Sequence, residues 1–376
     1  MAFSRLPTEI LDEITTNCDP DVLIALCRLG NAILHALAAR SLYREVAFGT
    51  LEELERFCAA LAARAVLAGY VRSLTVVFDF SDDWVEPEVY DRREDCAQIL
   101  ARCENLRRLS VRDPQFMTDL AQVGEFPRLR ELCAPLIDEL GEFLVAHPRL
   151  RTLGIHGGID VSEVRDTVLS TLSGAGCAFD QLTTLDAPDW LGLALLRSSP
   201  GVINLTIRCT GVFAARERNN ALVKTPIPSI QELNCILSSW DDVDVTLLAK
   251  VFPSLTKLRF VAEQTRNEYG FDIEPFVENL HASLPTFASL THLSLTFDVC
   301  PLDRDDLEHL LTPRILQLLC PSLEEISISV PDAVEWLRIP TGAIYDYLEF
   351  QMDIILGQEP SQSEFQMAMA ELGVTI

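Results

Sequence analysis

Apolar residues recur along most of the chain in one short phrase. The phrase is an apolar residue, two variable residues, a second apolar residue, one variable residue and usually a third apolar residue, as in Leu106–Val111 and Leu290–Leu295. Successive side chains of a strand point to opposite faces, so the paired apolar positions predict a short strand with one buried face. The ten copies begin at Val71, Leu106, Leu129, Leu150, Leu182, Val202, Ile230, Leu255, Leu290 and Leu323.

Successive phrases begin 20 to 35 residues apart, 28 on average, with helix-like runs such as 95–103 and 314–319 between them. Each unit is therefore predicted to be strand, loop and helix. One unit cannot bury its apolar face alone, so neighbours must stack. A generic α/β domain is the alternative, but the strands of such a domain do not share one sequence pattern such as P-x-L-x-x-L before each strand. From about residue 69 to 340 the chain resembles leucine-rich repeat proteins, which implies an α/β solenoid with a curved parallel sheet inside and helices outside.

Repeats of that family commonly place Asn or Cys in the turn after the strand, where the side chain satisfies backbone groups. We expect irregular turns and variable curvature here, because this ladder is missing. The corresponding positions hold Pro114, Gly158, Trp190, Thr210, Glu263 and Asp298.

The first fifty residues have a different pattern. Apolar residues at helical spacing follow Pro in residues 6–14, a second apolar run extends from Asp19 to the helix stop at Gly30, and a third extends from Asn31 to Val46. These runs predict three helices in a stretch too short to be stable alone.

The phrase L-P-x-E-I-L-D-E-I, the segment D-P-x-x-L-x-x-L and the ending S-L-Y-R-E-V make residues 4–48 resemble the F-box of fungal leucine-rich repeat F-box proteins. The resemblance implies that these helices dock on the Skp-type adaptor of a cullin-RING ubiquitin ligase while the repeats hold a protein substrate. The alternative is an N-terminal cap over the first repeat, and the two roles are compatible. The residues that match the motif, and so the implied adaptor contacts, are Leu6, Pro7, Ile10, Leu11, Ile14, Leu23, Leu26 and Cys27.

The predicted organisation has four parts. Residues 1–48 form the F-box-like unit, 49–68 a helical linker or cap, 69–340 about ten repeats, and 341–376 a C-terminal cap and tail. The apolar run 344–356 is interpreted as an end cap rather than as a Met or aromatic binding stripe.

Chemistry-bearing motifs are missing. The sequence contains no P-loop, GxGxxG, GxSxG, HExxH or EF-hand pattern, its six His are dispersed, and the acids of 303–306 fit a helix N-terminus. Eleven Cys without a CxxC pair favour neither a disulfide framework nor a zinc module. We therefore expect no catalysis, metal or cofactor, and a reducing compartment, cytosol or nucleus. No apolar run reaches membrane-spanning length, and the start lacks a signal-peptide core, so no membrane association is expected.

The charge of the chain is −26, from 56 acidic and 30 basic residues, which argues against a nucleic-acid partner. Five segments outside the phrases carry 22 of the excess negative charges, and a merely solvating role is one interpretation of them. The variable strand positions, by contrast, hold five basic and four acidic residues. These variable positions point away from the core onto the concave face of the predicted solenoid. We expect this concave face to bind an acidic or phosphorylated protein segment. The candidate residues are Arg108, Arg112, His156, Arg208, Lys257, Arg259 and His292.

These features predict a substrate-receptor subunit of an F-box ubiquitin ligase, whose partners are the Skp-type adaptor, the cullin-RING ligase and an unknown protein substrate. A free-standing repeat scaffold without a ligase is the alternative.

Overall fold

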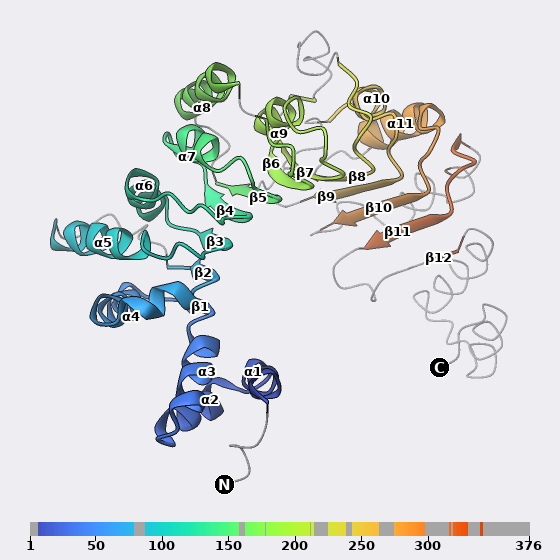
Figure 1. Cartoon of the computed structure of the whole chain (residues 1–376). Helices are drawn as coiled ribbons and strands as arrows, with labels where there is room; N and C mark the ends of the chain where they lie inside the picture. Colours follow the sequence, from blue (N-terminus) through green and yellow to red (C-terminus); the bar gives the residue numbers. More distant parts are fainter. Residues whose placement is uncertain are drawn as a thin grey trace, which may run out of the picture. The chain divides into compact units, whose positions relative to one another are not determined.

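The chain forms two compact units of parallel strands and helices in the computed structural model (Figure 1). Unit 1 comprises residues 1–187 and 198–201, and unit 2 comprises 188–197 and 202–376. The structure describes residues 7–78, 87–157, 162–176, 178–210, 212–213, 225–237, 243–262, 274–297, 316, 319–329 and 339–340.

Unit 1 contains a parallel sheet in which strands pair in chain order. Its strands are β1 (Glu45–Phe48), β2 (Ser73–Val76), β3 (Arg108–Val111), β4 (Glu131–Pro135), β5 (Thr152–His156) and β6 (Thr184–Pro188). Its helices are α1 (Thr8–Thr16), α2 (Pro20–Arg28), α3 (Ala32–Leu42), α4 (Leu51–Ala63), the 3-10 helix η2 (Ala65–Tyr70), α5 (Pro87–Leu100), α6 (Pro114–Val123), α7 (Leu140–Ala146) and α8 (Ser162–Ala175).

Unit 2 repeats the arrangement with β7 to β11 parallel and in chain order, and β12 antiparallel to β11. Its strands are β7 (Asn204–Cys209), β8 (Glu232–Leu237), β9 (Lys257–Ala262), β10 (His292–Phe297), β11 (Glu325–Ser329) and β12 (Ile339–Pro340). Its helices are α9 (Asp189–Leu196), α10 (Val245–Val251), α11 (Glu274–Ser283) and the 3-10 helix η6 (Leu284–Thr286).

All ten apolar phrases of the sequence are strands, β2 to β11. The first apolar residue of every phrase is at most 1% exposed and the second at most 3%, so both positions form the core. The second positions also lie in register, for example Leu109 opposite Leu132 and Leu258 opposite Leu293. Helices α4 to α8 in unit 1 and α9 to α11 in unit 2 cover one face of the sheet (Figure 1), and the variable strand residues lie on the other, which we call the open face.

Within each unit, one backbone carbonyl couples a described repeat to the next. The residue before a strand accepts two N–H groups from the following repeat, as the Arg107 carbonyl does from Arg130 (2.8 Å) and Glu131 (2.9 Å). In unit 2 the Gln231 carbonyl accepts from Thr256 and Lys257 in the same way. These bonds fix the register of neighbouring strands just before each strand begins.

The third helix of the chain is shorter than the pattern predicts. It ends at Leu42 rather than Val46, and β1 follows, pairing with β2 through Val46 opposite Leu74 and Phe48 opposite Val76. The Arg44 carbonyl accepts N–H groups from Arg72 and Ser73, which removes it from the helix and starts the first repeat. Helix α4 and most of η2 lie in the predicted linker 49–68, and together they connect β1 to β2.

Three buried aspartates accept backbone N–H groups where helices α6, α9 and α10 begin. Asp113, two residues past the end of β3, accepts the Phe116 N–H at 2.6 Å, and Asp244 accepts the Thr246 N–H at 2.9 Å. Asp189 accepts from the N–H groups of Trp190 (2.8 Å), Thr210 (3.0 Å) and Val212 (3.0 Å). All three aspartates are at most 2% exposed. The predicted turn positions 158, 263 and 298, the helix-like run 314–319 apart from two residues, and the segments 303–306 and 341–376 lie outside the described residues.

Candidate protein-binding surfaces

Helices α1 to α3 and the turn after α2 hold six of the nine exposed large apolar side chains in the described part of the chain. They pack on a small core of Leu11, Leu34 and Leu37, with Leu26 against it. Because three short helices have few inward positions, branched aliphatic side chains remain on the outside. We call the following six the helical patch: Ile10 (42% exposed), Ile14 (39%), Val22 (45%), Ile24 (40%), Leu29 (62%) and Ile33 (55%).

The structure divides the predicted adaptor contacts into two groups. Ile10, Ile14 and the exposed Pro7 are accessible, and Leu26 and Cys27 are half-buried. Leu11 and Leu23 are each only 5% exposed, because they pack inside the three-helix unit, so they hold the helices together rather than present a contact. Leu6 lies outside the described residues.

The helical patch also contains four residues that the motif did not indicate: Val22, Ile24, Leu29 and Ile33. A helical wheel could have found Val22 and Ile24, because both flank the buried Leu23. Leu29 lies in the turn before Gly30, whose φ of 69° ends α2 as predicted.

On the open face of unit 1, one predicted cation, Arg108, is paired with an acidic neighbour in register. Arg108 donates to Glu131 across adjacent strands at 2.5 Å, and this carboxylate raises the pKa of the Arg108 guanidinium. His156 contacts the Cys133 thiol with its Nδ1 at 3.7 Å. Arg112 is exposed directly after β3. The predicted basic surface is thus partly compensated within the chain.

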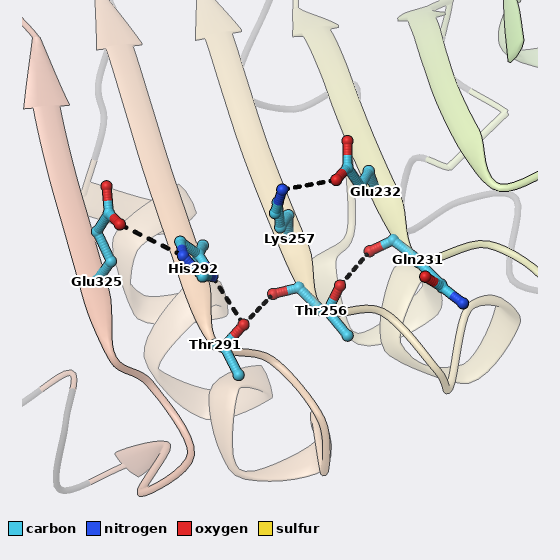
Figure 2. A network of polar contacts seen from close by, with 7 residues as sticks. All are labelled: Gln231, Glu232, Thr256, Lys257, Thr291, His292 and Glu325. Carbon is cyan, nitrogen blue, oxygen red and sulfur yellow. Dashed lines mark hydrogen bonds and ion pairs between the residues drawn. The ribbon is translucent and has the colours of Figure 1, made fainter.

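The same pairing occurs on the open face of unit 2 (Figure 2). Lys257 donates to Glu232 at 2.6 Å, and His292 Nε2 lies 3.3 Å from Glu325. The other His292 nitrogen is 2.7 Å from the Thr291 hydroxyl, which in turn donates to the Thr256 carbonyl at 3.1 Å. The charged side chains are about half-exposed or somewhat less, so each pair contributes about 0–1 kcal/mol.

Between these pairs, the open face of unit 2 has a pocket of about 290 Å³. Lys257, Arg259 and His292 line it, whereas Arg208 does not. Asn234 lies next to Arg259 in register, and its buried Oδ1 has no hydrogen-bond partner among the described residues. A buried acceptor without a donor is costly, so this pocket fits a ligand group with an N–H or O–H.

The buried titratable groups have structural surroundings rather than those of a reactive site. Burial raises the pKa of the Cys103 thiol to about 12, so it stays protonated and unreactive at neutral pH. Burial lowers the pKa of His147, whose Nδ1 donates to the Phe143 carbonyl while Nε2 accepts from the Phe126 N–H. Burial also raises the pKa of Asp189, although its hydrogen bonds oppose that rise.

Within the described ranges, no three His, Cys, Asp or Glu side chains are grouped as a metal site would require. The nine cysteines in those ranges are all free thiols. No described helix combines the length and the hydropathy needed to cross a bilayer.

No protein-family model and no curated protein matches the chain. Among solved structures, it is similar to the leucine-rich repeat-containing protein LegL7 from Legionella pneumophila. The sequence identity is 16%, the match covers 77% of this chain and 92% of that one, and the TM-score is 0.39. A likeness this weak carries no conclusion about function. The evidence for repeats is the register of the strands within this chain.

Proposed function

We propose that the protein is a non-catalytic substrate receptor of a cullin-RING ubiquitin ligase, acting in the cytosol or nucleus without a cofactor. In this proposal α1 to α3 dock on a Skp-type adaptor, and the repeats bind a protein substrate. The helical patch is the observation that carries the proposal. Fully burying one such side chain is worth about 1.5–3 kcal/mol, so a partner that covers several of them gains substantial affinity.

The geometry suits a receptor because the helices are fixed to the first repeat. Helix α3 contacts both β1 and η2, and α1, α3 and the first repeats belong to one compact unit. The protein then contributes no bond-making group. It holds the adaptor and the substrate on one chain, which raises the effective concentration of substrate near the ubiquitin-transfer machinery.

Co-purification with a Skp-type adaptor tests the proposal. The full chain should bind, and Ile10→Asp/Ile33→Asp should weaken binding by about a hundredfold, because two carboxylates would lose water in an apolar interface. Val66→Asp is the matched control: Val66 is 64% exposed in η2 of the same unit, outside the helical patch. Equal binding by the double variant and the control would exclude the helical patch as the docking site.

A free-standing protein-interaction scaffold is the second candidate, and the pocket with Asn234 and Arg259 favours it, since this pocket requires no adaptor. If the purified full chain binds no Skp-type adaptor, the ligase proposal fails and the scaffold function remains.

A further inference from the structure

A row of arginines lies at the N-terminal ends of the strands of the unit 1 sheet, which form one edge of that sheet. The residue directly before each of the strands β1 to β5 is arginine, and we call this set the arginine row: Arg44, Arg72, Arg107, Arg130 and Arg151. The same position before β6 is Thr183, and in unit 2 it holds Ile203, Gln231, Thr256, Thr291 and Glu324. The row is therefore a property of unit 1 and not of the repeat as such.

The backbone of the arginine row is held rigidly. Each of the five carbonyls accepts two N–H groups from the next repeat, at 2.7–3.1 Å. Neighbouring parallel strands lie about 4.8 Å apart, so the five Cα positions span roughly 19 Å. The backbone therefore fixes the spacing of the five arginines along this line.

The side chains of the row lack counter-charges within the described part of the chain. Four are exposed, and Arg72 is half-buried and donates to the Asn105 carbonyl at 3.2 Å. No carboxylate of the described residues lies within ion-pair distance of these five guanidinium groups. Burial, and then repulsion from Arg107, Arg128, Arg40 and Arg44, lowers the pKa of Arg72.

This edge contrasts with the open face, where Arg108, Lys257 and His292 already have acidic partners. Exposed Arg128 and Arg149 add to the charge, since each lies two residues before a member of the row. A chain of net charge −26 thus concentrates uncompensated arginines on one edge of one unit.

We propose that the arginine row binds an extended acidic segment of another protein, through carboxylates or phosphorylated hydroxyls that accept hydrogen bonds from the guanidinium groups. Arginine suits both anions because its planar fork donates two parallel hydrogen bonds. At about 3.3 Å per residue, a segment of roughly six residues covers the 19 Å span.

A protein segment fits better than a nucleic acid. A nucleic acid carries one phosphate per nucleotide along its whole length, and the net charge of −26 on this chain repels such a polyanion more strongly than a short segment with few charges. The proposal goes beyond the receptor function and does not need adaptor binding. If the receptor function also holds, the arginine row defines the substrate class.

The test measures binding of two fluorescein-labelled dodecapeptides to the purified full chain by fluorescence anisotropy. One alternates glutamate with serine, and the other alternates phosphoserine with glycine. We expect the full chain to bind at least one of them, with affinity falling steeply from 50 to 300 mM NaCl. Arg107→Glu/Arg130→Glu should weaken binding by about tenfold or more, and Arg107→Gln/Arg130→Gln by less, because it removes attraction without adding repulsion.

The matched control is Arg28→Glu/Arg56→Glu, which makes the same charge change at two exposed arginines on α2 and α4 of unit 1. It should keep binding within about twofold. Equal weakening by both reversals, no binding of either peptide at 1 mM, or tighter binding of a twelve-nucleotide oligo-dT than of the peptides would each overturn the proposal. Adaptor binding is measured separately, so its failure refutes only the ligase function.

Discussion

Replacing Asp189 tests whether a buried carboxylate organises the first turn of unit 2. Its Oδ1 accepts from the Trp190 N–H and from the Thr210 hydroxyl (2.5 Å), and its Oδ2 accepts from the N–H groups of Thr210 and Val212. Asp189→Ala leaves three backbone donors without this acceptor. Each buried donor without an acceptor costs about 1–3 kcal/mol, and loss of the carboxylate's own burial cost offsets part of the sum, so we expect a net loss of about 2–4 kcal/mol.

Asp189→Asn separates hydrogen bonding from charge. If the asparagine oxygen takes the place of Oδ2, it still accepts from Thr210 and Val212, while its NH₂ group can donate to the Thr210 hydroxyl. Only the Trp190 N–H then loses its acceptor, which costs about 1 kcal/mol. The wild type should be the most stable, Asp189→Asn the next and Asp189→Ala the least stable.

Hydrogen exchange followed by mass spectrometry localises the effect, since two units can unfold in separate transitions. In Asp189→Ala the amides of Thr210 and Val212 should exchange about thirtyfold faster or more, as expected for about 2 kcal/mol. The exposed Asp138→Ala in unit 1 is the control and should change neither amide. Unchanged exchange in Asp189→Ala, or a larger loss in Asp189→Asn, would refute the reasoning.

Three further outcomes are expected. Leu109→Ala, at a side chain with no exposure, should destabilise unit 1 by about 2–5 kcal/mol in urea unfolding, whereas a cost below 1 kcal/mol would contradict its core position. Because burial lowers the pKa of His147, the stability of unit 1 should be full above about pH 6.5 and fall as the pH drops from there to the lowered pKa, by at most about 1.4 kcal/mol per pH unit. His147→Gln should remove this part of the pH profile, and an unchanged profile would contradict the assignment. A double-mutant cycle on Lys257 and Glu232 should give a coupling energy of about 0.2–1 kcal/mol that vanishes in 1 M NaCl, and a larger value would show that the pair is shielded from water.

The strands were predictable because each phrase combines a period of two with the same lead-in, and this local signal places both core positions. Strand β1 has the same signal with aromatic residues: Tyr43, Val46 and Phe48 have the phrase spacing, with Arg44 in second position. It was missed because it directly follows a helix, and its residues continue the helical run. The length of the apolar run cannot show where α3 ends and β1 begins, because that boundary depends on a hydrogen bond between Arg44 and Arg72, 28 positions away.

The binding surfaces were less predictable, for two reasons. Summing the charges of the open face hides which of them are neighbours, whereas aligning the phrases places Arg108 beside Glu131 and Glu232 beside Lys257. The same alignment displays the arginine row in the second position of five repeats. The burial of Leu11 and the role of Asp189 could not be found in this way, since both depend on contacts between segments whose packing has no fixed period.

The carbonyl that accepts two N–H groups also explains why repeats of 20 to 35 residues coexist in one chain. Register is set within about four residues of each repeat, so the rest of the repeat can gain or lose a helical turn without shifting the strands. Insertions placed after a strand should therefore be tolerated, and insertions between the first apolar residue and the strand should not. An engineer could lengthen one loop of this protein to create a new contact while every neighbouring side chain keeps its position.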